Sequence, residues 1–83
     1  MEKRQSFTET FRERLGLFTF FHLGSDAEVR MTESETALVV SVAHSRVVPF
    51  EFTLSWNEVG ELLADPNRFE AFMLDYLTRH RRS

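Results

Sequence analysis

Histidines and carboxylates are the residues of this chain that could carry chemistry, and their spacing decides which chemistry is open to it. The 83-residue sequence has no cysteine, which excludes disulfides, thiolate chemistry and cysteine-rich zinc sites. His22, His44 and His80 are too far apart in sequence to form a metal-binding pair, and no HExxH motif occurs. We therefore expect no metal ion and no cofactor.

A catalytic site would need an oriented nucleophile, or an acid and a base that face each other. Glu33 and Glu35 flank a predicted turn and could form an acid-base pair, but acidic residues are ordinary in solvated turns. The three glycines stand alone, so no phosphate-binding loop is present, and no serine lies in a nucleophile elbow. We expect that the protein is not an enzyme.

Acidic residues are concentrated in the middle and later part of the chain. Between Asp26 and Asp75 there are ten acidic residues and three arginines, although the whole chain has a formal net charge of only −3. Spacings of three and four place several of them on one face of two predicted helices. This predicted acidic face comprises Glu58, Glu61, Asp65, Glu70 and Asp75. It is either a solvated surface or a docking surface for a basic protein partner. In the extreme case, such an acidic surface would imitate the phosphates of a nucleic acid.

Positive charge is concentrated at the C-terminus, in the cluster Arg79, His80, Arg81 and Arg82. Its simplest role is to complement the dipole of the preceding helix. If the two termini came together, these arginines could instead contact nucleic acid along with Lys3 and Arg4, although a pI of about 5.5 argues against this role. We assign residues 79–83 as a basic tail without predicted structure, which allows it to be disordered.

The clearest structural pattern begins at Val47. Alternating apolar residues predict a strand with one buried face, which comprises Val48, Phe50, Phe52 and Leu54. Pro49 cannot donate a ladder hydrogen bond, so the strand is expected at a sheet edge or at a bulge. Ser55 and Glu58 then form a capping-box pattern that predicts the start of a helix.

A second helix is predicted to begin after Asp65, which can cap it, with Pro66 at its first position. Its apolar residues recur at offsets of three and four, the period of one helical face. They are Phe69, Phe72, Met73, Tyr76 and Leu77.

The N-terminal third is ambiguous. Ser6 to Glu9 resembles another capping box, and apolar residues at steps of four predict a helix that ends near Gly16. Residues 17–23 are rich in aromatics and lie between Gly16 and Gly24, which favours a strand. The same residues also continue the helical stripe, so one longer helix through Gly16 is the alternative, at a cost of about 1 kcal/mol.

With a strand at 17–23, further strands at 28–32 and 37–43 and the edge strand, the order of elements is α-β-β-β-β-α-α. We therefore expect one small α+β domain over residues 1–83. It consists of an antiparallel three- or four-stranded meander with an N-terminal helix and two C-terminal helices.

Nine phenylalanines, one tryptophan and one tyrosine are many for a chain of this length. They either fill the chain's own core or are shared between subunits, and we expect a homodimer. Ala37–Ala43 is apolar on both faces, so a sheet covered by helices on one side would expose its other face, unless the N-terminal helix folds over it. The expected dimer interface comprises Phe18, Phe20, Phe21 and Val40, with Leu17 beside them.

No run approaches the roughly 18 apolar residues of a membrane span, and the N-terminus leads into no secretory segment. We therefore expect a cytoplasmic protein with no membrane contact. The expected function is that of a non-enzymatic protein-interaction module, a small bacterial or phage-type regulator or inhibitor that occupies the surface of a protein partner. The alternative is a nucleic-acid-binding regulator that uses Arg79, Arg81 and Arg82.

Overall fold

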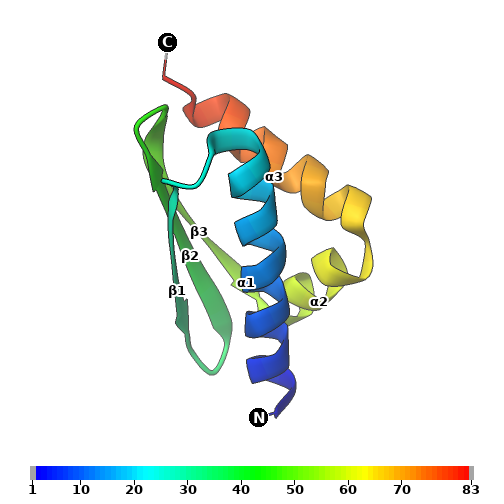
Figure 1. Cartoon of the computed structure of the whole chain (residues 1–83). Coiled ribbons are helices and arrows are strands. Elements are labelled where there is room, and N and C mark those ends of the chain that lie inside the picture. Colours follow the sequence, from blue (N-terminus) through cyan, green and yellow to red (C-terminus); the bar gives the residue numbers. More distant parts are fainter. Residues whose placement is uncertain (1, 83) are drawn as a thin grey trace.

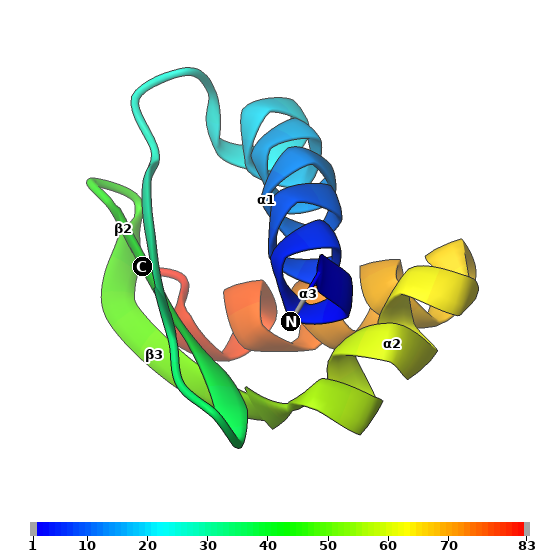
Figure 2. The ribbon, with the colours of Figure 1, turned by 90° about the horizontal axis from the view of Figure 1, so that it is seen from below.

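Three helices cover one face of a three-stranded antiparallel sheet (Figure 1, Figure 2). The computed structural model describes the backbone of residues 2–82 and the side chains of residues 6–82. The elements in chain order are α1 (Glu2–Leu23), β1 (Glu28–Glu33), β2 (Ala37–His44), β3 (Val47–Ser55), α2 (Trp56–Ala64) and α3 (Pro66–His80). The predicted α+β fold is confirmed, with three strands in the meander order β1-β2-β3.

The predicted strand at 17–23 is wrong, because α1 runs unbroken through Gly16 to Leu23. The helical period places Phe11, Leu15 and Phe18 on one buried stripe, and the rings of Phe11 and Phe18 both pack edge-on against Phe69. Burying one such side chain contributes about 1.5–3 kcal/mol, which exceeds the roughly 1 kcal/mol that an interior glycine costs. Tertiary packing therefore favours the continuous helix over a strand at residues 17–23.

Gly24 ends α1. Its φ angle of 103° lies in the left-handed region, and its N–H donates to the carbonyls of Thr19 and Phe20 at 3.1 Å. The chain can therefore leave the helix and turn back into β1.

The central strand β2 sends alternate residues into the core, and β3 is an edge strand, as Pro49 predicted. The pairing of the two strands is irregular between Val42 and His44. One detail of the predicted alternation is wrong for this reason: Val47 is buried, whereas Val48 is 46% exposed.

The predicted caps are confirmed. The Glu58 N–H donates to Ser55 Oγ at 3.2 Å, and the Ser55 N–H donates to Glu58 Oε1 at 2.8 Å. Asp65 Oδ1 accepts from the N–H groups of Asn67 and Arg68, and Pro66 occupies the first turn of α3. These caps fix the point where the chain passes from β3 to α2 and from α2 to α3.

The basic C-terminal segment has defined structure up to Arg82. α3 continues through His80, Arg81 bridges to Val47, and the Arg82 N–H donates to the Arg46 carbonyl at 2.9 Å. Arg79 and His80 therefore belong to α3, Arg81 and Arg82 lie against Val47 and Arg46, and Ser83 lies outside the described residues.

The core lies between the sheet and the helices, and aromatic rings fill much of it. Phe52 packs edge-on against Phe72, and Phe50 stacks on Tyr76 at 5.4 Å between centroids. Much of the aromatic content therefore stabilises the chain's own core. Phe20 and Phe21 of α1 are the aromatic side chains that lie largely outside the core.

Candidate functional site

The residues predicted for a dimer interface are divided between the core and the surface. Val40 is fully buried and cannot contact another molecule, and Phe18 is only 7% exposed, at the wall of a groove beside α1. Phe20 is 61% exposed and Phe21 84%. Because 17–23 is helical, Phe18 faces the core while the two residues that follow Thr19 face outward.

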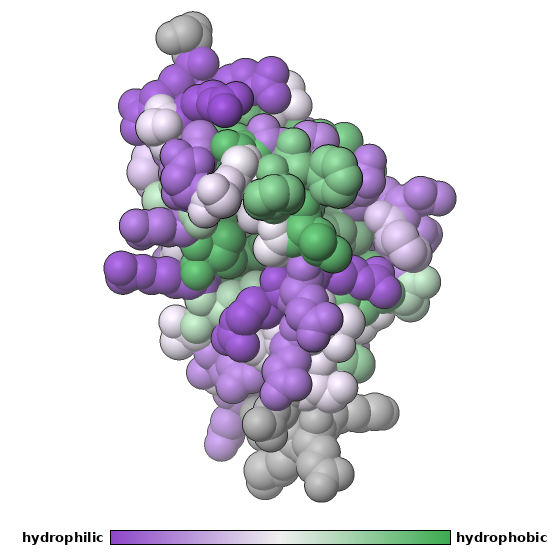
Figure 3. Space-filling model, viewed as in Figure 1, coloured by the Kyte–Doolittle hydropathy of each residue, from purple (hydrophilic) through white to green (hydrophobic). Residues whose placement is uncertain are grey.

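Leu17, Phe20 and Phe21 together form an exposed apolar surface that we call the α1 patch. They lie at helical offsets of zero, three and four, which places them on one face, and Leu17 is 65% exposed. Hydrophobic atoms gather over the C-terminal half of α1 in Figure 3. If about 200 Å² is taken for each side chain, the patch presents roughly 400 Å² of apolar surface. That value is typical of the largest patch on a monomer, and such patches are often functional.

A groove of about 490 Å³ runs beside the α1 patch, where α1 meets the start of α3. Leu17 and Phe21 line it together with Arg14, Pro66 and Glu70. The Arg14 Nη1 atom is buried and has no hydrogen-bond partner among the described residues. The groove therefore offers an apolar wall next to a cationic and an anionic side chain.

Gly16 lies on α1 next to the patch. Apart from its chain neighbours and the adjacent backbone of α1 itself, no atom of the described structure lies within 4 Å of the position that a Cβ would take there. The fold itself therefore does not require glycine at this position, which leaves the helix backbone open to close approach by another molecule.

The outer face of the sheet is largely polar, although Val39 of the central strand lies half-buried on it, whereas Val40 and Val42 face the core. Val39 lies between Thr32 and Thr53, and Ser41 lies between Arg30 and Glu51. The alternative in which α1 covers this face is wrong, because all three helices lie on the other side (Figure 2).

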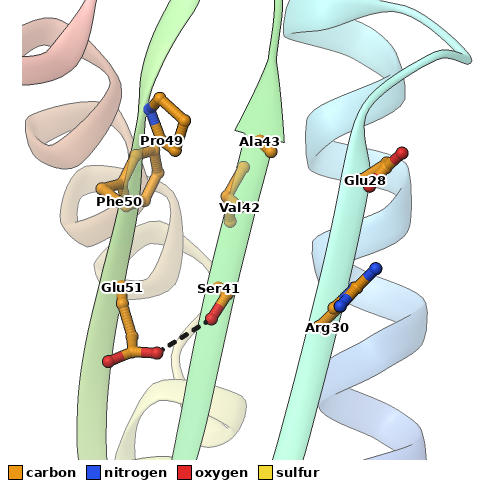
Figure 4. A pocket seen from close by; sticks show the side chains of 8 residues that line it. All are labelled: Glu28, Arg30, Ser41, Val42, Ala43, Pro49, Phe50 and Glu51. Carbon is orange, nitrogen blue, oxygen red and sulfur yellow. Dashed lines mark hydrogen bonds between the residues drawn. The ribbon is translucent and has the colours of Figure 1, made fainter.

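A shallow hollow of about 320 Å³ lies on this outer face (Figure 4). Glu28 and Arg30 of β1 project beside Ser41 of β2 and Glu51 of β3, and the Ser41 hydroxyl donates to Glu51 at 3.1 Å. The charges of Arg30, Glu28 and Glu51 are mixed, and this face presents no large apolar surface.

Most carboxylates of the predicted acidic face have partners within the chain. Glu58 and Asp65 act as helix caps. Glu61 pairs with Arg68 at 3.7 Å, and Asp75 pairs with Arg79 at 2.8 Å. Among the side chains of residues 6–82, Glu70 is the member of this face without an ion pair or hydrogen bond, and it lines the groove beside α1.

The predicted nucleic-acid contact residues are also separated. Arg79 pairs with Asp75 and lies over the Tyr76 ring at 4.8 Å. Arg81 and Arg82 lie at the end of the molecule opposite the first turn of α1 (Figure 1). The two termini therefore do not converge into one basic surface.

The histidines have structural partners. His44 is buried at the end of β2, where its Nδ1 accepts from the Arg46 N–H at 3.0 Å. Its Nε2 therefore carries the hydrogen and donates to Asp26 Oδ1 at 2.8 Å. This hydrogen bond, above all, lowers the pKa of Asp26 below its ordinary value of 3.8. No sequence pattern indicates this pair, because a hydrogen bond across 18 residues depends on how the chain folds back into the sheet.

The other two histidines pack on aromatic rings. The His22 ring lies 4.3 Å from that of Phe18, and His80 stacks on Phe50 while its Nδ1 lies 2.8 Å from the Tyr76 carbonyl. Within the described part of the chain, no three His, Asp or Glu side chains are arranged to hold a metal ion.

Glu33 accepts a hydrogen bond from the Thr8 hydroxyl, which ties β1 to α1. Among the described helices, none is both long and apolar enough to span a membrane. Comparison of the chain with protein-family models, curated proteins and solved structures gave no match.

Proposed function

We propose that this protein is a non-enzymatic interaction module that binds through the α1 patch, and that the patch is occupied by a second copy of the chain. The observation that carries the proposal is the exposure of Leu17, Phe20 and Phe21 on a domain whose other aromatic rings are largely packed. Exposed apolar surface costs free energy in water, and a protein partner removes that cost.

The size of the patch supports a weak dimer. Two patches would bury roughly 800 Å² of apolar surface, whereas stable interfaces bury about 1,200–2,000 Å² in total. Residues at the rim of the groove would have to supply the rest of the buried surface area. We therefore expect a dissociation constant in the micromolar range rather than the nanomolar range.

The charges at the rim support a second copy as the occupant. Arg14 and Glu70 line the same groove but form no ion pair with each other within the chain. A twofold interface contacts the same surface on both copies, so Arg14 of each copy can pair with Glu70 of the other. The open position at Gly16 would allow the two α1 helices to approach closely.

A dimer built on α1 leaves the exposed side chains of α2 and the outer face of the sheet available. A regulatory role, in which the protein occupies the surface of another protein, is therefore compatible with the dimer. The acidic face would contribute little to such binding, because Glu70 lies in the proposed dimer interface and the other carboxylates of this face have partners within the chain.

Sedimentation equilibrium between about 1 and 200 μM tests the proposal. Phe20→Glu should weaken the dimer roughly 10,000-fold, because each of the two copies loses about 120 Å² of ring surface, worth about 3 kcal/mol per copy at 25 cal/mol per Å². Val48→Glu, at another exposed apolar residue, and Glu61→Lys, on the acidic face, should leave the dimer intact.

A wild-type mass of one 9.8 kDa chain at every concentration would overturn the second copy as the occupant. Equal weakening by Val48→Glu would overturn the assignment of the interface to α1.

A further inference from the structure

A pocket at the C-terminal end of α3 brings three arginines together, and among the described residues that line it none has a carboxylate. It is formed by the end of α1, the turn between β2 and β3 and the residues that follow α3, which meet at one end of the molecule (Figure 1). Its volume of about 500 Å³ lies in the range of small-molecule sites. Arg46, Arg81 and Arg82 supply the polar side, and Leu23, Val47 and Leu77 form an apolar floor.

Backbone contacts fix the arginines relative to one another. The Arg82 N–H donates to the Arg46 carbonyl, and Arg82 Nε donates to the Val47 carbonyl at 3.2 Å. Arg81 lies in the bridge to Val47. The three guanidinium groups are therefore attached to a backbone that is ordered without a ligand, which reduces the entropy lost on binding.

The hydrogen-bond donors of this cluster are largely unused. In the described part of the chain, the guanidinium groups of Arg46 and Arg81 form no hydrogen bond or ion pair. Asp26 is close enough for Arg46 to lower its pKa, but that carboxylate already accepts a hydrogen bond from His44. Each guanidinium has five N–H donors in a planar fork that matches the oxygens of a phosphate.

We propose that this pocket binds the phosphate group of a small phosphate monoester, with its organic group on the apolar floor. A phosphate monoester carries a charge of about −1.5 to −2 at neutral pH, which compensates most of the charge of the three arginines. Leu23, Val47 and Leu77 are themselves already buried, so an apolar or aromatic group that packs against them gains by removing its own surface from water. A nucleic acid fits less well, because it requires a broad basic face and the first turn of α1 lies at the far end of the molecule.

Isothermal titration at constant ionic strength, with phenyl phosphate, inorganic phosphate and a ten-nucleotide single strand as probes, tests this site. We expect saturable binding of phenyl phosphate, about tenfold tighter than that of inorganic phosphate. Arg46→Gln and Arg81→Gln should each weaken it at least tenfold. Arg30→Gln removes the same charge from the outer face of the sheet and should have no effect, and circular dichroism would establish that all three variants are folded.

Three results would overturn the phosphate site as a whole. The first is the absence of saturable binding of either phosphate, and the second is an equal loss in Arg30→Gln, which would indicate general charge attraction. The third is tighter binding of the oligonucleotide than of phenyl phosphate with a steep salt dependence, which would assign the arginines to a nucleic-acid surface. Equal affinity for phenyl phosphate and inorganic phosphate would overturn the role of the apolar floor.

Discussion

Replacement of Gly16 by alanine should stabilise the protein. Glycine in a helix interior is about 0.8–1.0 kcal/mol less favourable than alanine. The new methyl group would meet no atom of another element within 4 Å, so tertiary packing neither adds to this gain nor reduces it. For a domain of this size, about 1 kcal/mol corresponds to a rise in Tm of roughly 4–8 °C.

The measurement should be made in the Phe20→Glu background, which is expected to be monomeric, so that dimer formation does not contribute. Thermal unfolding followed by circular dichroism gives the Tm. Gly24→Ala is the matched control with the opposite expected sign, because a φ of 103° is strained for alanine. It should lower the Tm, since the left-handed region costs an ordinary residue about 1–2 kcal/mol.

A lower Tm for Gly16→Ala would refute the reasoning, because it would mean that α1 is interrupted at this residue. In the otherwise unmodified chain, the same substitution should weaken the proposed dimer, since a methyl group would separate the two helices. A stabilised variant with an unchanged dimer would exclude close approach at Gly16.

Four further substitutions test the packing, the capping and the proton linkage. Phe52→Ala should cost about 3–5 kcal/mol of unfolding free energy in urea, and more than Phe72→Ala, because Phe52 is buried and Phe72 only partly so. Ser55→Ala should cost about 1 kcal/mol through loss of the cap, and an unchanged urea midpoint would contradict the role of the capping box. The lowered pKa of Asp26 implies a contribution to stability that is complete above the ordinary value of 3.8 and is lost as pH falls through the lower folded value. The difference in urea midpoint between wild type and Asp26→Asn should therefore be present at pH 7 and shrink below pH 3.8, whereas a constant difference would exclude this linkage.

The second half of the fold could be predicted because its signals are local. Ser55 and Glu58 are three residues apart, and Asp65 caps a helix that begins at the next residue. A cap of this kind is complete within one helical turn, so no distant contact is needed to interpret it. The strand at 17–23 was predicted wrongly because local signals conflict there, and the contacts of Phe11 and Phe18 with Phe69 decide between them.

Charge patterns predicted the candidate sites less well, because sequence spacing does not show which charges are already paired. Glu58 and Asp65 belong to caps, and Asp75 is held by Arg79 four residues later. Arg46 lies 35 residues before Arg81, so its place in the phosphate pocket depends on the bridge between Val47 and Arg81. Most carboxylates of the predicted acidic face are therefore less available to a binding partner than the sequence predicts. Arg81 and Arg82, in contrast, share their pocket with Arg46, which the sequence does not place beside them.

The proposed interface depends directly on the period assigned to residues 17–23. In a strand, Phe18 and Phe20 would share one face and Leu17 would share the other with Phe21. In the helix, Phe18 enters the core, whereas Leu17, Phe20 and Phe21 form the exposed patch. Assigning residues 17–23 to a helix instead of a strand therefore places the exposed apolar surface on α1 and not on the sheet. Since the outer face of the sheet is largely polar, α1 is where a protein partner gains the most from apolar contact.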